Sequence, residues 1–301
     1  MKWSNHLHFK IKKKVLKICN FMNINLAINE GTFILKKNSI ITAQLDSELL
    51  LSKVIKRDRK DFILNQNNEL DTKSYENFKF LINQRKKRKP LAYLIGKKDF
   101  WKHQFIISEG VLIPRPDTEI IVDEVLKITK YKSNLKVLDV GLGSGCILLS
   151  ILKEKKSFSG VGIDVSKKCV EIARLNAFEL GLLNRVKIIK SDVDNFVYGK
   201  YDLVISNPPY INQLDLNCLE EDIINFEPKI ALNGGLDGLS VVRRVINRAS
   251  ELLKKKGKLI LEIAFNQKSK IKELLIKKGF YINKVVKDYA NNDRCIISTK
   301  I

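Results

Sequence analysis

Apolar residues recur at intervals of three and four positions through the first part of the chain, from about residue 10 to residue 84. Two stripes illustrate the pattern, namely Leu45, Leu49, Leu50 and Val54, and then Phe78, Leu81 and Ile82. Such spacing places apolar side chains on one face of a helix. Asp46 and Asp71 stand where helix N-caps are expected. We therefore predict a small N-terminal helical domain over residues 1–89.

The pattern changes between Pro90 and Ile113, where apolar and aromatic clusters become short. Gly96, Lys102-His103 and Glu109-Gly110 interrupt them. Short apolar runs separated by glycine and polar pairs are typical of a β-hairpin. Residues 90–112 are therefore predicted to form a hairpin-like connector.

From residue 113 to residue 301 short apolar runs alternate with longer helical stretches. The strand candidates are Lys136–Val140, Gly160–Asp164, Val186–Lys190, Tyr201–Ser206 and Lys258–Ala264. The helix candidates are Cys146–Lys155, Lys167–Leu180, Leu239–Lys256 and Gln267–Lys278. This alternation predicts an α/β domain with a doubly wound, mostly parallel sheet covered by helices, a Rossmann-like architecture.

The composition excludes several classes of protein. Hydrophobic residues make up 45% of the 301 positions, which is too many for a disordered chain. No apolar run reaches the eighteen or so residues that a membrane span needs, and residues 1–14 lack the features of a secretory signal. We therefore expect a cytoplasmic protein without a membrane partner.

The cysteines and histidines argue against metal and nucleophilic chemistry. The five cysteines are scattered and never form a Cys-x-x-Cys pair, which predicts free buried thiols and neither disulfides nor structural zinc. No histidine follows His103, so the predicted α/β domain has no imidazole to activate a serine or cysteine. We expect no metal site.

Positive charge is in large excess. Lys and Arg number 55 against 33 Asp and Glu, a formal net charge of +22. Such a field attracts nucleic acid, and the run Arg85–Lys89 offers phosphate contacts. The same excess also follows from a chain rich in Lys, Ile and Asn throughout, as a biased genome produces. Direct nucleic-acid binding is thus compatible with the sequence but not required.

A glycine-rich turn follows the first predicted strand of the α/β domain. It comprises Gly141, Leu142, Gly143, Ser144 and Gly145, and it opens a predicted helix. Glycines here let the backbone turn tightly and approach a bulky ligand. The spacing is not Gly-x-Gly-x-x-Gly, because Cys146 occupies the third glycine position.

Three carboxylates define the expected ligand. Asp164 ends the next strand, where a doubly wound fold places the acceptor for ribose hydroxyls. A nicotinamide cofactor would also satisfy that position. Asp139, within the first strand, suits a cationic amino acid and sulfonium better than a pyrophosphate, so S-adenosylmethionine is preferred. Asp192, after the third strand, is a candidate acceptor for the adenine amino group.

The tetrapeptide Asn207-Pro208-Pro209-Tyr210 follows the strand Tyr201–Ser206. An amide nitrogen is a poor nucleophile, so methyl transfer to it depends on orientation. The Asn207 side-chain carbonyl and the Pro208 backbone carbonyl can each accept one N–H of a substrate NH2 group. The prolines stiffen the loop, and Tyr210 offers a flat face to a planar amide or a nucleobase.

Three hypotheses are consistent with this motif. The first is methyl transfer to a side-chain amide, and the second is transfer to an exocyclic amine of adenine or guanine in DNA or RNA. The third is a non-catalytic ribosome-associated module that keeps the fold; the intact Asn207–Tyr210 motif argues against it.

These residues resemble the peptide-chain release factor glutamine methyltransferases. The resemblance extends from about Ile40 to Arg294, and the segment Ile113–Glu119 discriminates best among nitrogen methyltransferases. It implies that class 1 release factors are the partners and that the helical domain and hairpin help to dock them. It further implies that Gly141–Gly145, Asp164 and Asn207 contact S-adenosylmethionine, and that Asn207–Tyr210 hold the glutamine of the Gly-Gly-Gln loop.

Three positions depart from the family pattern. Leu142 replaces a small or hydroxyl residue, Val193 stands where an aromatic often flanks the adenine, and Ala264 follows Glu262-Ile263 where glycine is usual. These departures bear on donor affinity more than on the type of reaction.

Overall fold

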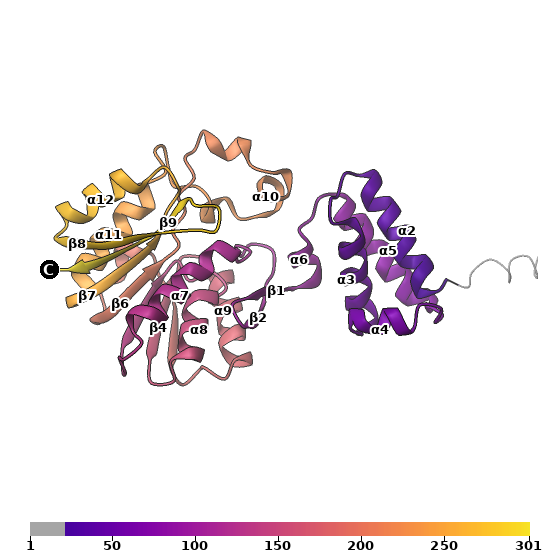
Figure 1. The fold of residues 1–301 in the computed structure, drawn as a ribbon, viewed down its shortest axis with the longest axis horizontal. Helices are drawn as coiled ribbons and strands as arrows, with labels where there is room; N and C mark the ends of the chain where they lie inside the picture. The colour runs from indigo at the N-terminus through magenta and orange to yellow at the C-terminus, as the bar shows by residue number, and fades with distance from the viewer. Residues whose placement is uncertain (1–21) are drawn as a thin grey trace, which may run out of the picture. The chain divides into compact units, whose positions relative to one another are not determined.

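The computed structural model describes residues 22–301, apart from the side chain of Ile63. The chain divides into two compact units, Met1–Ile95 and Gly96–Ile301 (Figure 1). We expect a free buried thiol at Cys19 and no secretory signal in residues 1–14. Both stretches lie outside the described residues.

The first unit is helical, as predicted. Its helices are α2 (Ile24–Lys37), α3 (Ala43–Ile55), α4 (Arg59–Leu64), α5 (Thr72–Lys86) and α6 (Leu91–Ile95). Their apolar stripes meet in one core, in which Leu35, Leu50, Phe78 and Ile82 are almost completely buried. Burial of these stripes is the main source of stability for such short helices.

One of the two predicted N-caps is confirmed. The Asp71 side chain accepts a hydrogen bond from the Ser74 N–H and starts α5. The Asp46 prediction is wrong, because α3 already begins at Ala43 and Asp46 lies inside it. There the buried Asp46 carboxylate accepts a hydrogen bond from Arg85 Nε at 2.7 Å. Arg85 is therefore buried in an ion pair, and it is not the exposed phosphate contact that the basic run suggested.

The connector contains a helix as well as a hairpin. Residues Leu91–Ile95 form α6, because Pro90 supplies the carbonyl that accepts from Tyr93 N and Leu94 N. The hairpin follows in the second unit and consists of β1 (Lys97–Phe100) and β2 (His103–Ile106). Trp101 turns between them with a φ of 56°.

The second unit is built on a seven-stranded sheet with the order β5-β4-β3-β6-β7-β9-β8. Its strands are β3 (Lys136–Val140), β4 (Ser159–Asp164), β5 (Val186–Lys190), β6 (Tyr201–Ser206), β7 (Leu253–Glu262), β8 (Phe280–Lys287) and β9 (Asp293–Lys300). Neighbouring strands from β5 to β7 are parallel, and β9 is antiparallel to both β7 and β8. The mostly parallel α/β fold is confirmed, and the two last strands were not predicted.

The helices of this unit are α7 (Glu119–Ile128), α8 (Cys146–Glu154), α9 (Lys167–Glu179), α10 (Glu221–Phe226), α11 (Ser240–Leu252) and α12 (Lys268–Lys277). Short 3-10 turns occur at Pro116–Thr118, Val193–Asn195, Asp215–Cys218 and Lys229–Ala231. The helix predicted over Leu239–Lys256 ends at Leu252, because Leu253 already pairs with Tyr201 as the first residue of β7.

Alternation along the strands assigns residues to the two faces of the sheet. Leu138 and Val140 of β3 and Leu261 of β7 pack in one core with α11 and α12. Asp139 and Glu262 therefore point to the opposite face, which α7 and α8 cover (Figure 1). Two buried carboxylates thus lie under the same layer of helices.

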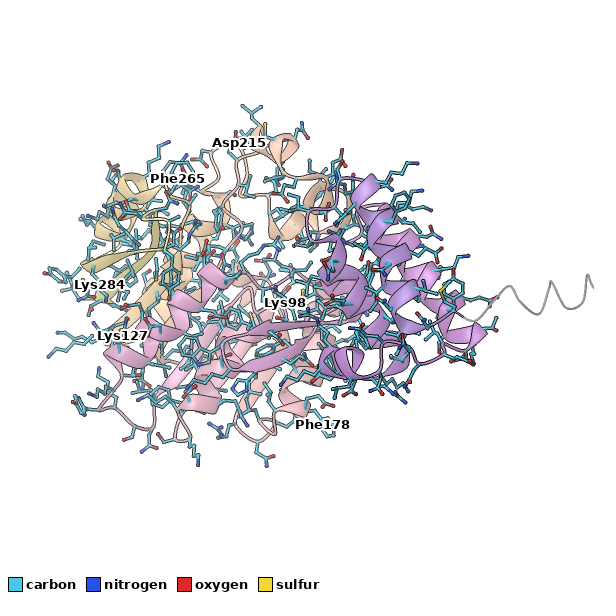
Figure 2. The ribbon with its side chains drawn as sticks, turned by 45° about the vertical axis from the view of Figure 1, so that its right-hand side comes forward. Lys98, Lys127, Phe178, Asp215, Phe265 and Lys284 are labelled. Atoms are coloured by element: carbon cyan, nitrogen blue, oxygen red, sulfur yellow. The ribbon has the colours of Figure 1, made fainter. Side chains whose placement is uncertain are left out.

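Part of the positive surface charge is locally compensated. Lys127 of α7 and Lys284 of β8, both labelled in Figure 2, each pair with the buried carboxylate of Glu124. None of the described helices is long and apolar enough to cross a bilayer.

Candidate active site

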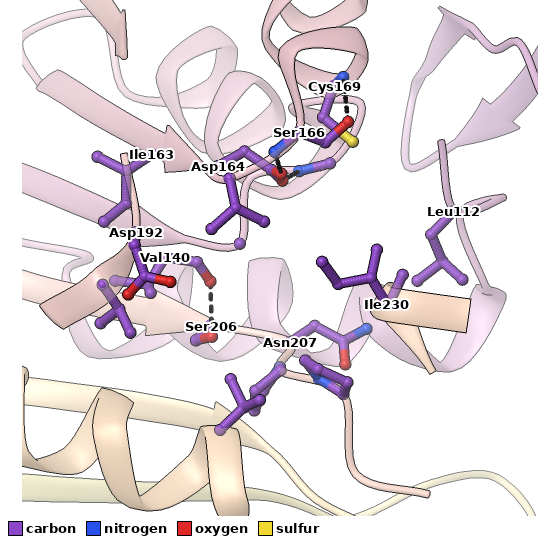
Figure 3. A pocket seen from close by; sticks show the side chains of 18 of the residues that line it. Leu112, Val140, Ile163, Asp164, Ser166, Cys169, Asp192, Ser206, Asn207 and Ile230 are labelled. Carbon is purple, nitrogen blue, oxygen red and sulfur yellow. Dashed lines mark hydrogen bonds between the residues drawn. The ribbon is translucent and has the colours of Figure 1, made fainter. Parts of the chain in front are cut away.

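A cavity lies at the carboxyl ends of the parallel strands (Figure 3). This edge is where open α/β sheets bind ligands, because the loops diverge there. Eight of the predicted residues line it: Gly141, Gly143, Asp164, Asp192, Val193, Asn207, Pro208 and Pro209. Its remaining walls are largely apolar and include Val140, Ile163, Val241 and Val245.

The glycine turn forms the floor of the cavity. Gly141 and Gly143 have φ angles of 78° and 58°, and a Cβ built on either would meet no atom within 4 Å. Positive φ and open space beside the backbone fit a turn against which a ligand lies closely. Gly145 also has positive φ, and it serves as the N-cap of α8.

Leu142 and Ser144 point away from the ligand space. The Leu142 side chain is buried and lies so close to Gly162 that a Cβ there would be 2.6 Å from it. Gly162 thus accommodates the bulk that Leu142 adds to the turn. Ser144, also buried, and Gly145 do not line the cavity.

Asp164 is held in a fixed orientation at the cavity wall. One carboxylate oxygen accepts from Gly143 N at 2.8 Å and the other accepts from Ser166 N at 2.9 Å. Each oxygen keeps a further lone pair, so both can accept hydroxyl donors from a ribose. Burial raises the pKa of Asp164, and these two backbone N–H groups oppose the rise.

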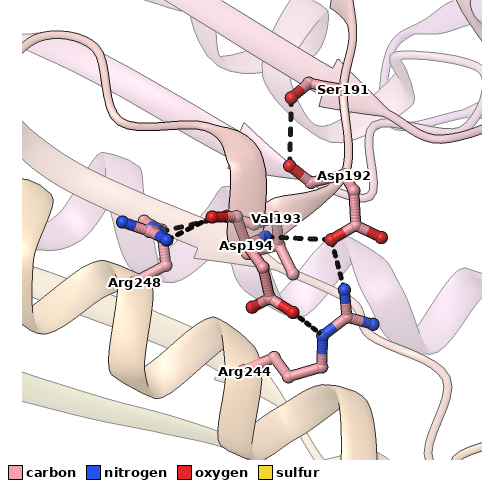
Figure 4. A network of polar contacts seen from close by, with 6 residues as sticks. All are labelled: Ser191, Asp192, Val193, Asp194, Arg244 and Arg248. Carbon is pink, nitrogen blue, oxygen red and sulfur yellow. Dashed lines mark hydrogen bonds and ion pairs between the residues drawn. The ribbon is translucent and has the colours of Figure 1, made fainter.

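Arg244 of α11 is a cavity residue that sequence reasoning missed. Its guanidinium bonds to Asp192 and to Asp194 Oδ2, the latter at 2.6 Å (Figure 4). The pKa of Asp192 is lowered, mainly because Arg244 donates a hydrogen bond to it. One Asp192 oxygen is thereby engaged, and the carboxylate stays available as an acceptor beside the buried Val193.

Asp139 lies beneath the turn and does not line the cavity. It is completely buried, and neither carboxylate oxygen has a hydrogen-bond partner among the described residues. Burial, reinforced by the Asp164 charge, raises the pKa of Asp139 to about 8. Buried carboxylate oxygens without a hydrogen-bond partner, as in Asp139, are consistent with a cationic ligand that binds close by.

We expect Asp139→Asn to stabilise the ligand-free protein at pH 8. The unfolded chain ionises this group near its ordinary pKa, whereas the folded pKa is about 8. Stability is therefore lost as pH rises between these two values. Asparagine removes that loss, so the melting temperature should rise by roughly 3–6 °C at pH 8 and by less at pH 5.

Differential scanning fluorimetry at the two pH values measures this effect. Glu273→Gln, which removes an exposed carboxylate from α12, is the control and should shift neither value. Equal shifts for Asp139→Asn at both pH values would show that ionisation of this carboxylate is not the cause.

Asn207 is oriented by a neighbour from another part of the chain. Its Nδ2 donates to the hydroxyl of Thr118 at 3.1 Å, and Thr118 is itself buried just before α7. Because Nδ2 is engaged, the Oδ1 atom is the free acceptor of this amide. The preceding Ser206 is anchored by a hydrogen bond from its hydroxyl to Val140 O.

Tyr210 does not present its ring to this cavity. Its hydroxyl donates to Glu262 Oε1 at 3.2 Å, and the residue lines a separate hollow with Asn212, Phe265 and Arg294. The prolines direct the chain so that the Tyr210 hydroxyl turns toward the end of β7. Tyr210 thus lines the second hollow and not the first, and its packing on a planar amide or a nucleobase stays a prediction.

An ion pair and a hydrogen bond connect the segment before α7 to the loop after β6. Arg115 pairs with Glu227 at 2.5 Å, and the other Glu227 oxygen accepts from Ile113 N at 3.3 Å. Pro228, next to Glu227, lines the cavity. The arginine of the discriminating segment thus fixes a cavity wall, a role that its position in the sequence did not reveal.

The thiols near the site are not nucleophiles. Cys169 lines the cavity, and burial raises the pKa of its thiol to about 12, so it is protonated at neutral pH. Cys146, Cys169 and Cys295 are buried, whereas Cys218 is exposed, contrary to the expectation of buried thiols. Within residues 22–301 no group of three or more His, Cys, Asp or Glu is arranged to hold a metal.

Comparison with known proteins gives consistent matches along the chain. Residues 27–96 match the PrmC N-terminal domain family, and residues 117–236 match the methyltransferase small domain family. A release factor glutamine methyltransferase of Clostridium acetobutylicum is 36% identical over 282 residues, covering 93% of this chain and 99% of that protein.

Two further relatives carry the same description. That of Fusobacterium nucleatum is 35% identical over 289 residues, covering 93% of this chain and 80% of the relative. That of Buchnera aphidicola is 35% identical over 280 residues, covering 93% of this chain and all of the relative.

Proposed function

The chain belongs to the release factor glutamine methyltransferase family, and from this premise we propose that it methylates the side-chain amide nitrogen of the Gly-Gly-Gln glutamine in class 1 release factors. The donor is S-adenosylmethionine. The proposal places the enzyme in the cytoplasm with the release factors as partners, and it assigns their docking to the helical unit and the hairpin.

The observation that carries the proposal is the orientation of Asn207 at the edge of the cavity. Thr118 engages its Nδ2, which leaves Oδ1 as an acceptor beside Pro208. A substrate NH2 group that donates one N–H to Asn207 Oδ1 and the other to Pro208 O has its plane fixed. Its nitrogen lone pair then points out of that plane, toward the donor space.

The described residues also fit the donor. Asp164 would hold the ribose hydroxyls, Asp192 the adenine amino group, and Gly141 and Gly143 the cationic amino acid end, with the buried Asp139 beneath the turn. Bound S-adenosylmethionine supplies a methyl group on a positively charged sulfur, and its transfer to nitrogen releases one amide proton. The apolar walls around Asn207 keep water away from the reacting nitrogen.

A transfer assay with a methyl-labelled donor separates this function from methylation of nucleic acid. The purified chain is incubated with a class 1 release factor and total RNA and DNA, and label is counted in the protein and nucleic-acid fractions. We expect label in the release factor, and none in a release factor whose Gly-Gly-Gln glutamine is alanine. Label in adenine or guanine would establish the alternative function instead.

A further inference from the structure

We propose that Glu262 is a positioning residue for methyl transfer, acting through the hydroxyls of Thr118 and Tyr210 to fix the Asn207 amide. The inference rests on the proposed function and deepens it. Glu262 does not line the cavity, so it would act on the substrate only through neighbouring residues.

Glu262 is the last residue of β7 and only 2% exposed. Its Oε1 accepts from the Tyr210 hydroxyl at 3.2 Å. Burial raises the pKa of Glu262, and the Thr118 hydroxyl opposes this rise. Its Oε2 has no hydrogen-bond partner within the described structure. A carboxylate buried among neutral donors costs free energy, so this arrangement is not the one that stability alone would favour.

The hydrogen bonds give the network a direction. The Thr118 hydroxyl has one proton, and when it donates that proton to Glu262 its oxygen lone pairs face Asn207 Nδ2, 3.1 Å away. The Asn207 amide then keeps Nδ2 toward Thr118 and Oδ1 toward the substrate. If Thr118 instead donated to Asn207, the amide would turn over and present NH2 where the substrate needs an acceptor.

Charged groups from several elements face this carboxylate. Burial raises the pKa of Glu262 to about 7; the Thr118 hydroxyl, Arg294 of β9 and the Tyr210 hydroxyl lower this pKa, and Asp117 raises it. Burial, and to a smaller extent the Glu262 carboxylate, raises the pKa of the Cys146 and Cys295 thiols. The ionised form of Glu262 only accepts hydrogen bonds, whereas the protonated form can donate one to Thr118 and reverse the network.

The first test is the pH profile of kcat at saturating donor and release factor. Wild-type kcat is expected to rise with pH through about 7, and Glu262→Gln should lower kcat by about 10–100-fold and abolish that rise. The donor Kd should stay within about twofold, since Glu262 does not contact the cavity. Glu273→Gln on α12 is the matched control, with kcat and profile as in the wild type.

A second pair of variants isolates the route through Thr118. Thr118→Val removes the hydroxyl and should lower kcat as Glu262→Gln does, whereas Thr118→Ser keeps it and should restore most of the rate. The double variant Thr118→Val/Glu262→Gln should be no slower than Thr118→Val alone. Losses that multiply, or a wild-type profile in Glu262→Gln, would overturn the proposal.

These outcomes are separable from failure of the proposed function. If the wild-type chain does not methylate the release factor, the function itself is wrong. If the wild type turns over and Thr118→Ser and Thr118→Val are equally active, only the positioning role fails. The serine and valine pair keeps the inference testable even where Glu262→Gln does not fold.

Discussion

Asn207→Ala is expected to lower kcat for release factor methylation by about 10²–10³-fold while the fold is retained. The alanine removes the Oδ1 acceptor, so the substrate NH2 group keeps only the Pro208 carbonyl and can rotate. A freely rotating amide seldom directs its lone pair at the donor carbon. Single-turnover kinetics with bound donor measure this effect without interference from product release.

The control for this variant is Asn247→Ala. Asn247 is an exposed residue of α11, away from the lining of the cavity, and its replacement should leave kcat unchanged. Donor binding by calorimetry reports whether the cavity is intact in both variants. Retained turnover in Asn207→Ala would contradict the role given to the Asn207 side chain.

Asp164→Ala is expected to weaken donor binding by about 10²-fold or more, because the ribose hydroxyls lose a charged acceptor. The loss has a second cause in this structure. Asp164 also accepts from Gly143 N and Ser166 N, so its removal frees the glycine turn from the start of α9. Both effects act on binding, and calorimetric titration with S-adenosylhomocysteine measures them together.

Asp164→Asn separates the two causes, because the amide oxygen can still accept one backbone N–H. Its affinity should fall between those of the wild type and Asp164→Ala. Glu171→Gln on α9 provides a control for the loss of one negative charge near the same helix. If Asp164→Ala bound the donor with wild-type affinity, the donor would not lie against the turn and β4.

The strands that position the site could be predicted from the sequence because β3 and β6 are buried on both faces and β5, at the edge of the sheet, alternates buried and exposed residues over its first four positions. Lys136–Val140, Val186–Lys190 and Tyr201–Ser206 have the bounds expected from their short apolar runs. Strand β8 lies at the antiparallel edge of the sheet, where Lys284 and Lys287 interrupt the apolar pattern, and β9 beside it has only the short apolar run Cys295–Ile297. Partial exposure of β8 and the shortness of the apolar run in β9 thus weakened the pattern by which strands are predicted.

The contacts that orient the site could not be predicted in the same way. Thr118 and Asn207 are 89 positions apart, and Tyr210 and Glu262 are 52 apart. The motif predicts that Tyr210 offers a flat face to the substrate, but it does not reveal that the Tyr210 hydroxyl turns toward Glu262 at the end of β7. Local patterns establish which residues reach the edge of the sheet, whereas tertiary packing decides which way each side chain points.

The central claim is that the Asn207 and Pro208 oxygens direct a glutamine amide nitrogen at the methyl donor. Tandem mass spectrometry of a release factor methylated by the purified chain tests it most directly, since fragmentation locates the added mass. The account predicts one methyl group on the side-chain nitrogen of the Gly-Gly-Gln glutamine, absent with Asn207→Ala. A methyl group on any other residue, or an unmodified glutamine in the presence of active enzyme, would contradict it.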